Sequence, residues 1–225
     1  MQKKRLFALM KLLIVAATAP EVGMLQQHLL QSPPPGHSVD VLLTGVGMLA
    51  TAYALTRQLQ HHHYDLVLQA GVGGSFDTGI LLGSLVFITR ERYGDIGAED
   101  HDDYIDLFDM GLTPASEHPH TGGWLHTPML PIHTAIDLPQ ASGLTVNTVS
   151  GSERTIALRL ARYSAQVESM EGAAFHYVCL QQNVPFAQVR SISNYVIPRD
   201  KSQWQMKDAI INLNNWLIDF IGTLQ

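Results

Sequence analysis

The chain has 225 residues, with 14 Lys or Arg against 20 Asp or Glu, and therefore a formal charge of −6 at pH 7. This balance argues against nucleic acid as a partner, because a nucleic-acid-binding surface is usually basic, and equally against an anionic membrane surface. Hydrophobic residues make up 46% of the chain, which is enough to bury the core of one domain of this size. We expect a single domain over residues 10–225.

The N-terminus permits two interpretations. A basic cluster at residues 3–5 followed by an apolar run to Ala19 resembles a secretory signal peptide. Lys11 interrupts that run, however, and the residues after it have the composition of a buried first strand. We favour the strand, with Met10 a candidate start, residues 1–9 a disordered extension and the protein in the cytoplasm. The run is also shorter than the roughly 18 uninterrupted apolar residues of a membrane span.

Short apolar runs alternate with segments of helical periodicity through most of the chain. In chain order, the pattern predicts a strand at 12–18, a helix at 21–31, a strand at 38–44, a helix at 48–62, strands at 65–69, 84–89 and 144–149, a helix at 152–163, a strand at 165–168, a helix at 170–182, a strand at 186–190 and a helix at 205–224. The predicted strands are apolar on both faces, which is typical of strands covered by helices. The alternation predicts a three-layer α/β fold in which helices flank a mostly parallel central sheet.

Residues 91–133 depart from this pattern. They are rich in Asp, Gly, His and Pro and show little periodicity. This stretch is long for a connection in a compact domain, and long irregular connections are usually functional or disordered. We predict a functional loop or a segment that contacts a partner.

Two glycine-rich segments follow predicted strands, Thr-Gly-Val-Gly at 44–47 and Gly-Val-Gly-Gly-Ser at 71–75. We predict tight turns here, because glycine allows positive φ and lets the backbone approach a ligand closely. Neither segment completes the Gly-x-Gly-x-x-Gly motif of a dinucleotide site. The histidine-containing segments lack a second cluster at metal-ligand spacing. We therefore expect neither a cofactor nor a metal.

Three polar residues follow predicted strands: Glu21, Glu171 and Asn194. Each has a structural alternative, because carboxylates favour the first turn of a helix and asparagine is common in turns. Ligands of open α/β sheets, however, bind at the carboxyl ends of the strands. Three such residues at one edge of one sheet therefore predict a ligand site.

The sequences around these residues resemble a known family. Residues 168–171 read Glu-Ser-Met-Glu and residues 190–194 read Arg-Ser-Ile-Ser-Asn, similar to the Glu-Met-Glu and Arg-x-Ile-Ser-Asp stretches of purine nucleosidases and phosphorylases. Residues 17–22 resemble the segment of methylthioadenosine/S-adenosylhomocysteine nucleosidases that carries a water-activating Glu. The resemblance covers nearly the whole chain except 91–133, and it implies a nucleoside phosphorylase-like fold and a homo-oligomer, a dimer in the first instance.

Within this family, the chain looks most like the futalosine hydrolases. The residues that carry this resemblance are 169–175, 190–195, Arg199 with Asp200, and Trp204. It implies hydrolysis of the N-glycosidic bond of futalosine in menaquinone biosynthesis, which releases hypoxanthine and leaves dehypoxanthine futalosine. The implied partners are a small nucleoside and water.

The chemistry of the reaction assigns a role to each of the three polar residues. The sugar becomes oxocarbenium-like as the bond breaks, so a carboxylate that grips the ribose can stabilise it, and Glu171 is our candidate. Glu21 is the candidate base that activates water. Asn194 stands where the family has Asp, and its two N–H donors suit a 6-oxopurine. The expected substrate-binding residues are Thr18, Val46, Val72, Gly73, Gly74, Arg154, Thr155, Ser169, Met170 and Ser193.

Three alternatives stay open at this point: another purine nucleosidase, a 6-oxopurine nucleoside phosphorylase, and a nucleoside-binding module without activity. Related phosphorylases carry an Arg just before the strand that follows the second glycine segment, whereas this chain has Gly83 there. The missing phosphate ligand favours water as the nucleophile. Futalosine also bears a carboxylate, for which Arg154 and Arg199 are the candidate cations.

Overall fold

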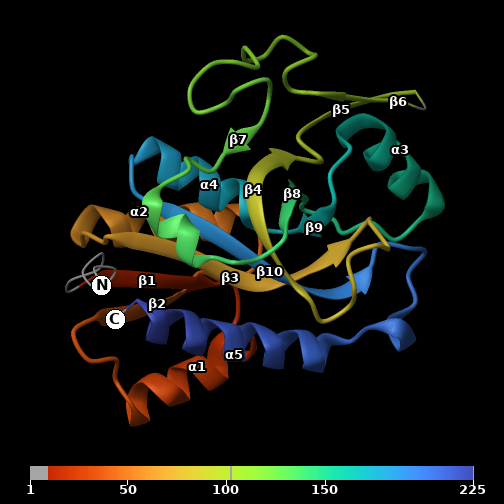
Figure 1. Ribbon diagram of the computed structural model, residues 1–225. Helices are drawn as coiled ribbons and strands as arrows, with labels where there is room; N and C mark the ends of the chain where they lie inside the picture. Colours follow the sequence, from red (N-terminus) through yellow and green to blue (C-terminus); the bar gives the residue numbers. More distant parts are fainter. Residues whose placement is uncertain (1–9, 102, 225) are drawn as a thin grey trace.

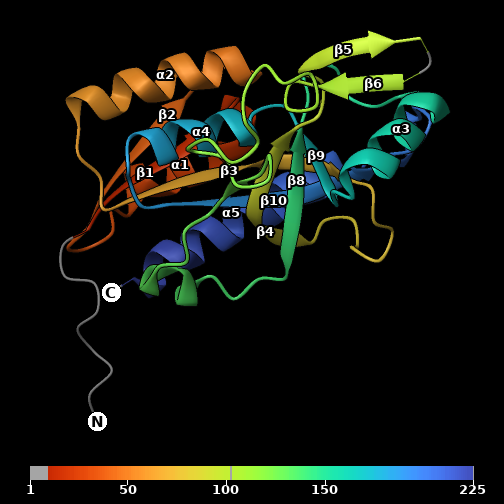
Figure 2. The same ribbon diagram turned by 90° about the horizontal axis from the view of Figure 1, so that it is seen from above.

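An eight-stranded sheet with helices on both faces forms the body of the protein (Figures 1 and 2). The structure, a computed structural model, describes residues 10–101 and 103–224, so the extension expected at 1–9 lies outside it. The sheet strands are β1 Lys11–Ala16, β2 Ser38–Leu43, β3 Leu66–Ser75, β4 Leu85–Tyr93, β7 Leu125–His126, β8 Gln140–Thr145, β9 Val167–Ser169 and β10 Phe186–Tyr195. The helices are α1 Ala19–Gln31, α2 Met48–His61, α3 Glu153–Tyr163, α4 Gly172–Gln181 and α5 Met206–Thr223, with 3-10 turns η1 Pro131–Ala135 and η2 Lys201–Gln203.

The strand order is β10-β4-β8-β9-β3-β1-β2, and β7 pairs with β4. Strand β10 also pairs with β3, so that β3, β10, β4, β8 and β9 close into a ring. The pairs β1–β2, β1–β3, β3–β10, β4–β8 and β8–β9 are parallel, whereas β10–β4, β3–β9 and β4–β7 are antiparallel. The predicted α/β fold with a mostly parallel central sheet is confirmed, and the antiparallel pairs make that sheet mixed.

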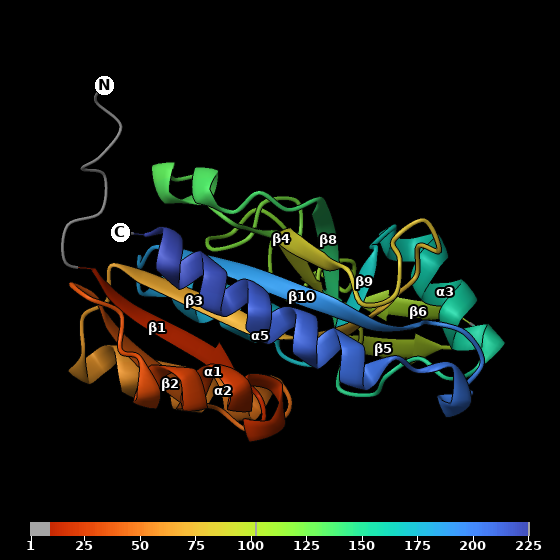
Figure 3. The same cartoon turned by 60° about the horizontal axis from the view of Figure 1, so that its bottom comes forward.

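Strand β1 shows how the two faces of the sheet are buried. Leu12 and Ile14 join a core cluster with α1 and α5, whereas Leu13 and Val15 join a second cluster with α2 and α4. Because successive side chains of a strand point to opposite faces, an uninterrupted apolar run is what such a central strand requires. Figure 3 shows α5 lying along β3 and β10 on the face that it shares with α1.

The structure corrects three sequence predictions. The segment Gly71–Ser75 is not a turn, because β3 runs through it and pairs with β10 as far as Tyr195. Asn194 consequently lies inside β10 rather than after it. The strand predicted at 144–149 lies at Gln140–Thr145, which is four residues earlier in the sequence.

The predicted loop at 91–133 contains regular structure. It begins within β4 and holds β7, the start of η1 and a separate two-stranded sheet of β5 Gly97–Asp100 and β6 Asp103–Asp106. Figure 2 shows β5 and β6 projecting beyond the central sheet beside α3. None of the helices in the described part of the chain is both long and apolar enough to cross a membrane.

Asn214 of α5 ties this helix to α1. Its Oδ1 accepts from the Leu25 N–H at 2.9 Å, and its Nδ2 donates to the Glu21 carbonyl at 2.9 Å and to the Ile210 carbonyl at 2.7 Å. Residues 21 and 25 are one turn apart, so their N–H and C=O are the groups that an α-helix pairs with each other. The fully buried Asn214 amide therefore fixes the first turns of α1.

Replacing Asn214 by Leu is expected to lower the free energy of unfolding by about 1–3 kcal/mol, because buried polar groups of Glu21 and Leu25 lose a partner. The matched control is Asn212→Leu on the same helix, whose exposed side chain donates to the Gly83 carbonyl. Urea denaturation measures both variants. Equal losses in the two would contradict this role of Asn214.

Candidate active site

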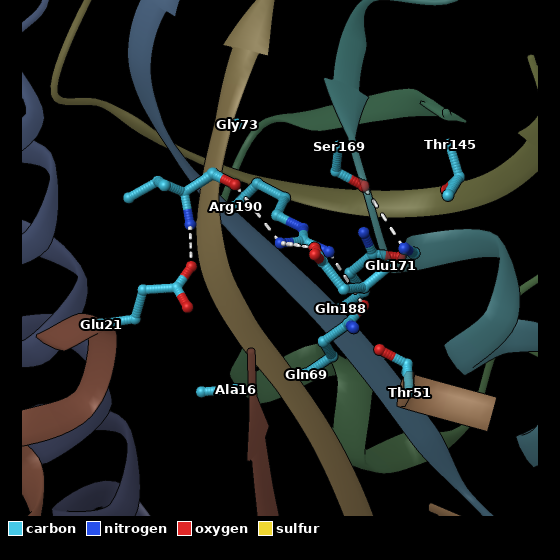
Figure 4. A network of polar contacts seen from close by, with 12 residues as sticks. Ala16, Glu21, Thr51, Gln69, Gly73, Thr145, Ser169, Glu171, Gln188 and Arg190 are labelled. Carbon is cyan, nitrogen blue, oxygen red and sulfur yellow. Dashed lines mark hydrogen bonds and ion pairs between the residues drawn. The ribbon is translucent and has the colours of Figure 1, made fainter. Parts of the chain in front are cut away.

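Glu21 lies in the first turn of α1, just after β1. Its Oε2 accepts from the backbone N–H and from the hydroxyl of Thr18, both at 2.9 Å, and its Oε1 accepts from the Val72 N–H at 3.2 Å. The carboxylate is buried, and Figure 4 shows it pointing from α1 to β3. Thr18, which caps the helix, therefore holds one oxygen of this carboxylate, and the backbone of β3 holds the other.

Glu171 occupies the N-cap position of α4, two residues after β9. Its Oε1 accepts from the Gly47 N–H at 3.1 Å, and its Oε2 lies 3.5 Å from Nη1 of Arg190. Arg190, on β10, also donates from Nη1 to the Val72 carbonyl at 3.3 Å and from Nη2 to Oε1 of Gln69 at 3.2 Å. All these side chains are buried, and Figure 4 shows them converging on the same part of β3.

Gly71 lets Glu21 and Arg190 approach the same position of β3. A Cβ at this position would lie 2.5 Å from Nη1 of Arg190 and 2.9 Å from Oε1 of Glu21, distances that real Cβ atoms do not show. Arg190 and Glu21 therefore meet over a strand position that has no side chain. The first glycine of the segment serves a close approach between side chains rather than the predicted turn.

Asn194 lies slightly further along the same pair of strands, opposite Gly74. A register shift between Ile192 and Asn194 marks a β-bulge at Ser193, and a bulge re-aims the side chains that follow it. Asn194 lines a pocket together with Gly74, Val149, Ser150, Glu168, Tyr195, Ile197, Arg199, Asp200 and Trp204. Its Oδ1 accepts from the Ser193 hydroxyl at 2.9 Å and its Nδ2 donates to the Tyr195 carbonyl at 3.0 Å.

The three predicted polar residues thus meet one stretch of β3. Glu21 binds the Val72 N–H, Arg190 joins Glu171 to the Val72 carbonyl, and Asn194 stands opposite Gly74. Val72 and Gly74 are two residue steps apart, which is about 7 Å along a strand and lies within the length of a nucleoside. The carboxylates lie at one end of this stretch and the pocket with the amide lies at the other.

The expected substrate-binding residues fall into two groups. Most belong to this stretch or border it: Thr18, Val46, Val72, Gly73, Gly74, Ser169, Met170 and Ser193. Val46, for example, precedes Gly47, whose N–H binds Glu171, and the Ser193 hydroxyl lies 3.2 Å from the Gly73 carbonyl. Arg154 and Thr155 instead lie in the first turn of α3, whereas the pocket is lined by Val149 and Ser150 from the preceding loop.

Arg199, Asp200 and Trp204, which the sequence singled out, belong to the wall of this pocket, whereas the sequence assigned no role to Glu168 or Arg159. Glu168 accepts from the Ser150 N–H at 2.9 Å and from the Ser150 hydroxyl at 2.6 Å, and its Oε2 lies 2.9 Å from Nη1 of Arg159. Oδ2 of Asp95 lies 3.7 Å from Nη2 of the same Arg159. The available signal was a carboxylate in an otherwise apolar strand, because Glu168 is buried and a buried charge needs a partner.

In the described residues, no group of three or more His, Cys, Asp or Glu side chains is arranged to hold a metal ion. The site instead offers two anchored carboxylates, one buried guanidinium, and a neighbouring pocket with an amide donor. Such a set can stabilise a positive sugar, accept a proton from water and bind a departing base.

Comparisons with known proteins identify the family. The phosphorylase superfamily matches residues 12–221 of the chain. Futalosine hydrolase from Streptomyces coelicolor is 34% identical over 197 residues, which cover 82% of this chain and 77% of that protein. The chain therefore belongs to the phosphorylase superfamily and, within it, to the futalosine hydrolase family.

Solved structures confirm the fold. A methylthioadenosine/S-adenosylhomocysteine nucleosidase from Colwellia psychrerythraea, in complex with adenine, has a TM-score of 0.80 at 23% identity and covers 97% of both chains. Futalosine hydrolase of Helicobacter pylori has a TM-score of 0.80 at 15% identity, covering 96% of this chain and 98% of that one. The predicted nucleoside phosphorylase-like architecture is thus confirmed.

Replacing Gly71 by Ala is expected to lower the free energy of unfolding by about 1–3 kcal/mol, because the methyl group would displace Arg190 or Glu21. The control is Gly23→Ala in α1, where an added Cβ meets nothing within 4 Å. That variant is expected to be neutral or more stable by up to about 1 kcal/mol. Urea denaturation of both variants checks the difference, and equal midpoints would refute the close-approach explanation.

Proposed function

We propose that this protein hydrolyses the N-glycosidic bond of futalosine, releasing hypoxanthine and leaving dehypoxanthine futalosine as a step of menaquinone biosynthesis in the cytoplasm. The observation that carries the proposal is the convergence of Glu21 and Glu171 on one stretch of β3, beside the pocket of Asn194. The futalosine hydrolase relatives support the choice of substrate.

In the proposed reaction, Glu171 supports the sugar. Bond cleavage leaves an oxocarbenium-like ribose, and a carboxylate beside it stabilises the positive charge while accepting from the ribose hydroxyls. The Gly47 N–H and Arg190 each hold one oxygen of Glu171, so the carboxylate is oriented before the substrate arrives. Preorganised charges of this kind need no rearrangement during the reaction.

Glu21 accepts the proton of the attacking water. Its carboxylate is held by Thr18 on one oxygen and by the Val72 N–H on the other. A general base must lie within hydrogen-bond reach of the proton that it removes. Since Gly71 brings Glu21 close to Arg190, and Arg190 contacts Glu171, a water at Glu21 lies near the sugar bound at Glu171.

Asn194 binds the departing base. The Ser193 hydroxyl donates to its Oδ1, which directs the Nδ2 group away from Ser193. One N–H of that group reaches the Tyr195 carbonyl, and the other can donate to the purine. When the Tyr195 bond is exchanged for the base, both N–H groups can donate, to N7 and to a 6-oxo oxygen. This pairing favours hypoxanthine over adenine as the leaving group.

We further propose that residues 10–225 act as one domain and that two copies form a dimer. Leu49 and Tyr53 lie one turn apart on α2 and are 86% and 64% exposed, and Val46 is 54% exposed beside them. Large apolar side chains gathered on one surface are typical of protein contacts. Light scattering of the purified chain tests this arrangement, and a monomer at micromolar concentration would contradict it.

The deciding experiment supplies futalosine, inosine and methylthioadenosine, with and without phosphate, and measures the released base. Hypoxanthine release from futalosine without phosphate supports the proposal. Strict dependence on phosphate would identify a phosphorylase, and faster cleavage of inosine or methylthioadenosine another nucleosidase. Tight binding without turnover of any nucleoside would identify a binding module.

Arg154 and Arg199 stay the candidate partners of the substrate carboxylate. The Michaelis constant of each alanine variant for futalosine tests this role.

Glu21→Gln is expected to lower kcat by at least about a hundredfold, because an amide cannot accept the proton from water. Binding of the substrate should remain measurable by calorimetry, since the shape of the side chain is kept. The control is Glu153→Gln, which changes an exposed carboxylate in the first turn of α3. Near-full activity of Glu21→Gln would show that this residue is not the base.

Asn194→Asp is expected to shift the preference toward 6-amino purines by roughly ten- to a hundredfold, because an unpaired buried polar group costs about 1–3 kcal/mol. The measurement is the ratio of hypoxanthine to adenine released from matched nucleosides. Asn215→Asp, an exposed position on α5, is the control. A ratio equal to that of the unaltered protein would contradict the assignment of the base pocket.

A further inference from the structure

Glu91, near the end of β4, carries a carboxylate that the proposed reaction does not use. The side chain is almost completely buried, with 1% of the residue exposed. Oε1 accepts from Nε2 of Gln188 at 2.9 Å, and Oε2 accepts from the Thr145 hydroxyl at 2.9 Å. Each oxygen thus has a donor from a different strand of the ring, β10 and β8.

Two glycines make room for this carboxylate. A Cβ at Gly143 or at Gly172 would overlap with the Glu91 carboxyl group, much closer than any real Cβ contact. Gly172 is the first residue of α4 and directly follows Glu171. Burial of a carboxylate is costly unless it is paired. The fold nevertheless keeps Glu91 buried, and residues 143 and 172 must be glycine to accommodate it.

Both hydrogen bonds of Glu91 lead to groups of the active site. The Thr145 hydroxyl also accepts from the Ala173 N–H at 2.6 Å, in the first turn of α4. This turn carries Glu171 as its N-cap. On the other side, Gln188 lies two residues before Arg190 on β10, so the two side chains share one face of the strand. Figure 4 shows Gln188, Arg190, Glu171 and Thr145 around the same space.

We propose that Glu91 is a positioning residue for the reaction: through Thr145 and Gln188, its carboxylate holds the first turn of α4 and the inner face of β10, so that Glu171 meets the sugar in the correct orientation. The inference rests on the proposed function in so far as Glu171 binds the sugar. Glu91 itself touches neither the substrate nor the water. It acts only through the groups that it orients.

The charges that face Glu91 make this role depend on pH. Glu171 from the N-cap of α4 and Arg190 from β10 act on it with opposite signs. His176 of α4, whose Nδ1 lies 3.1 Å from the Leu125 carbonyl, is the titratable group beside Gln188. Burial raises the pKa of Glu91 to about 7, against the effects of Gln188, Arg190 and Thr145. Burial lowers the pKa of His176 to about 3, so this histidine is neutral at pH 7. Only the ionised Glu91 accepts from both donors, and kcat should therefore rise with pH through about 7.

The first test is Glu91→Gln, which keeps the size of the side chain and places a donor opposite Gln188 or Thr145. We expect kcat to fall by about tenfold or more, because a small displacement of a catalytic group is costly, while KM changes by less than about twofold and the rise of kcat near pH 7 disappears. The control is Glu99→Gln on β5, an exposed carboxylate. A kcat within about twofold of the unaltered protein, with the same pH profile, would overturn the proposal.

A second pair of variants tests the route through Thr145 and does not depend on Glu91→Gln folding. Thr145→Ser keeps the hydroxyl and should retain activity. Thr145→Val removes the hydroxyl but keeps the shape, and should lower kcat as Glu91→Gln does. The double variant should lose less than the product of the two single losses, because both break one connection. Equal activity of the Ser and Val variants would exclude this route.

Two measurements test the role of Glu91 independently of the proposed substrate. The kinetic comparison uses whichever nucleoside the unaltered protein cleaves fastest, so failure on futalosine alone overturns the substrate and leaves the role of Glu91 under test. If no nucleoside is cleaved, the exchange of the Ala173 amide decides. It should be faster in Glu91→Gln and Thr145→Val than in Glu99→Gln and Thr145→Ser, and equal rates in all four would refute the positioning role.

Discussion

The contact between Arg190 and Glu171 is the interaction on which the rest of the site depends. Arg190 is among the largest fully buried side chains of the protein, and removing a guanidinium from water is costly unless acceptors surround it. The structure provides them from three places: the Glu171 carboxylate, the Val72 carbonyl and the Gln69 side chain. Val72 and Gln69 lie on β3 and Glu171 is the N-cap of α4, so this one cation on β10 fixes the positions of β3, β10 and α4 relative to one another.

The need of the buried Arg190 guanidinium for acceptors explains why β10 pairs with β3 in the closed ring of strands. β10 must run beside β3 to bring Arg190 to Gln69 and Val72, and the pairing continues from Phe186 to Tyr195. Along this length, β3 has glycine at positions 71, 73 and 74. A Cβ at these positions would meet Arg190, Val167 and Asn194, respectively. Glycine weakens a strand because it loses more conformational entropy on folding than other residues do. Here the hydrogen bonds to both neighbouring strands offset that weakness.

Much of the fold follows from the sequence, and the differences have physical causes. Helix periodicity located each of the five α-helices in the described part of the chain to within two residues, because each buries one face on the sheet. Strand β8 was misplaced since it contains Ser142 and Gly143 instead of an apolar run. The extent of β3 was missed because a glycine-rich strand and a glycine-rich turn share the same composition. Only the partner strand β10, more than 110 residues away in the sequence, distinguishes them.

The same reasoning explains which site residues the sequence could indicate. Glu21, Glu171 and Asn194 follow or end strands, and the topology of parallel sheets indicates that such positions meet. Glu91, Glu168 and Gln188 lie within strands and act through partners distant along the chain, such as Gln188 and Glu91 at a separation of 97 residues. An acid in an otherwise apolar strand, such as Glu168, indicates a buried polar group, but nothing local indicates which distant residue is its partner. Their partners can be identified only from the structure, in which the closed ring of strands brings them together.

The bulge at Ser193 separates two groups of side chains on β10. Residues 188, 190 and 192 project to one side of β10, and the extra residue turns Asn194 toward the pocket instead. Under the proposed function, recognition of the leaving group and support of the sugar lie on one continuous strand but on separate sides of it. A substitution at 194 can change which base is accepted without disturbing the buried charges at 190. In that reaction, the specificity for the base and the charges that act on the sugar can be altered independently of each other.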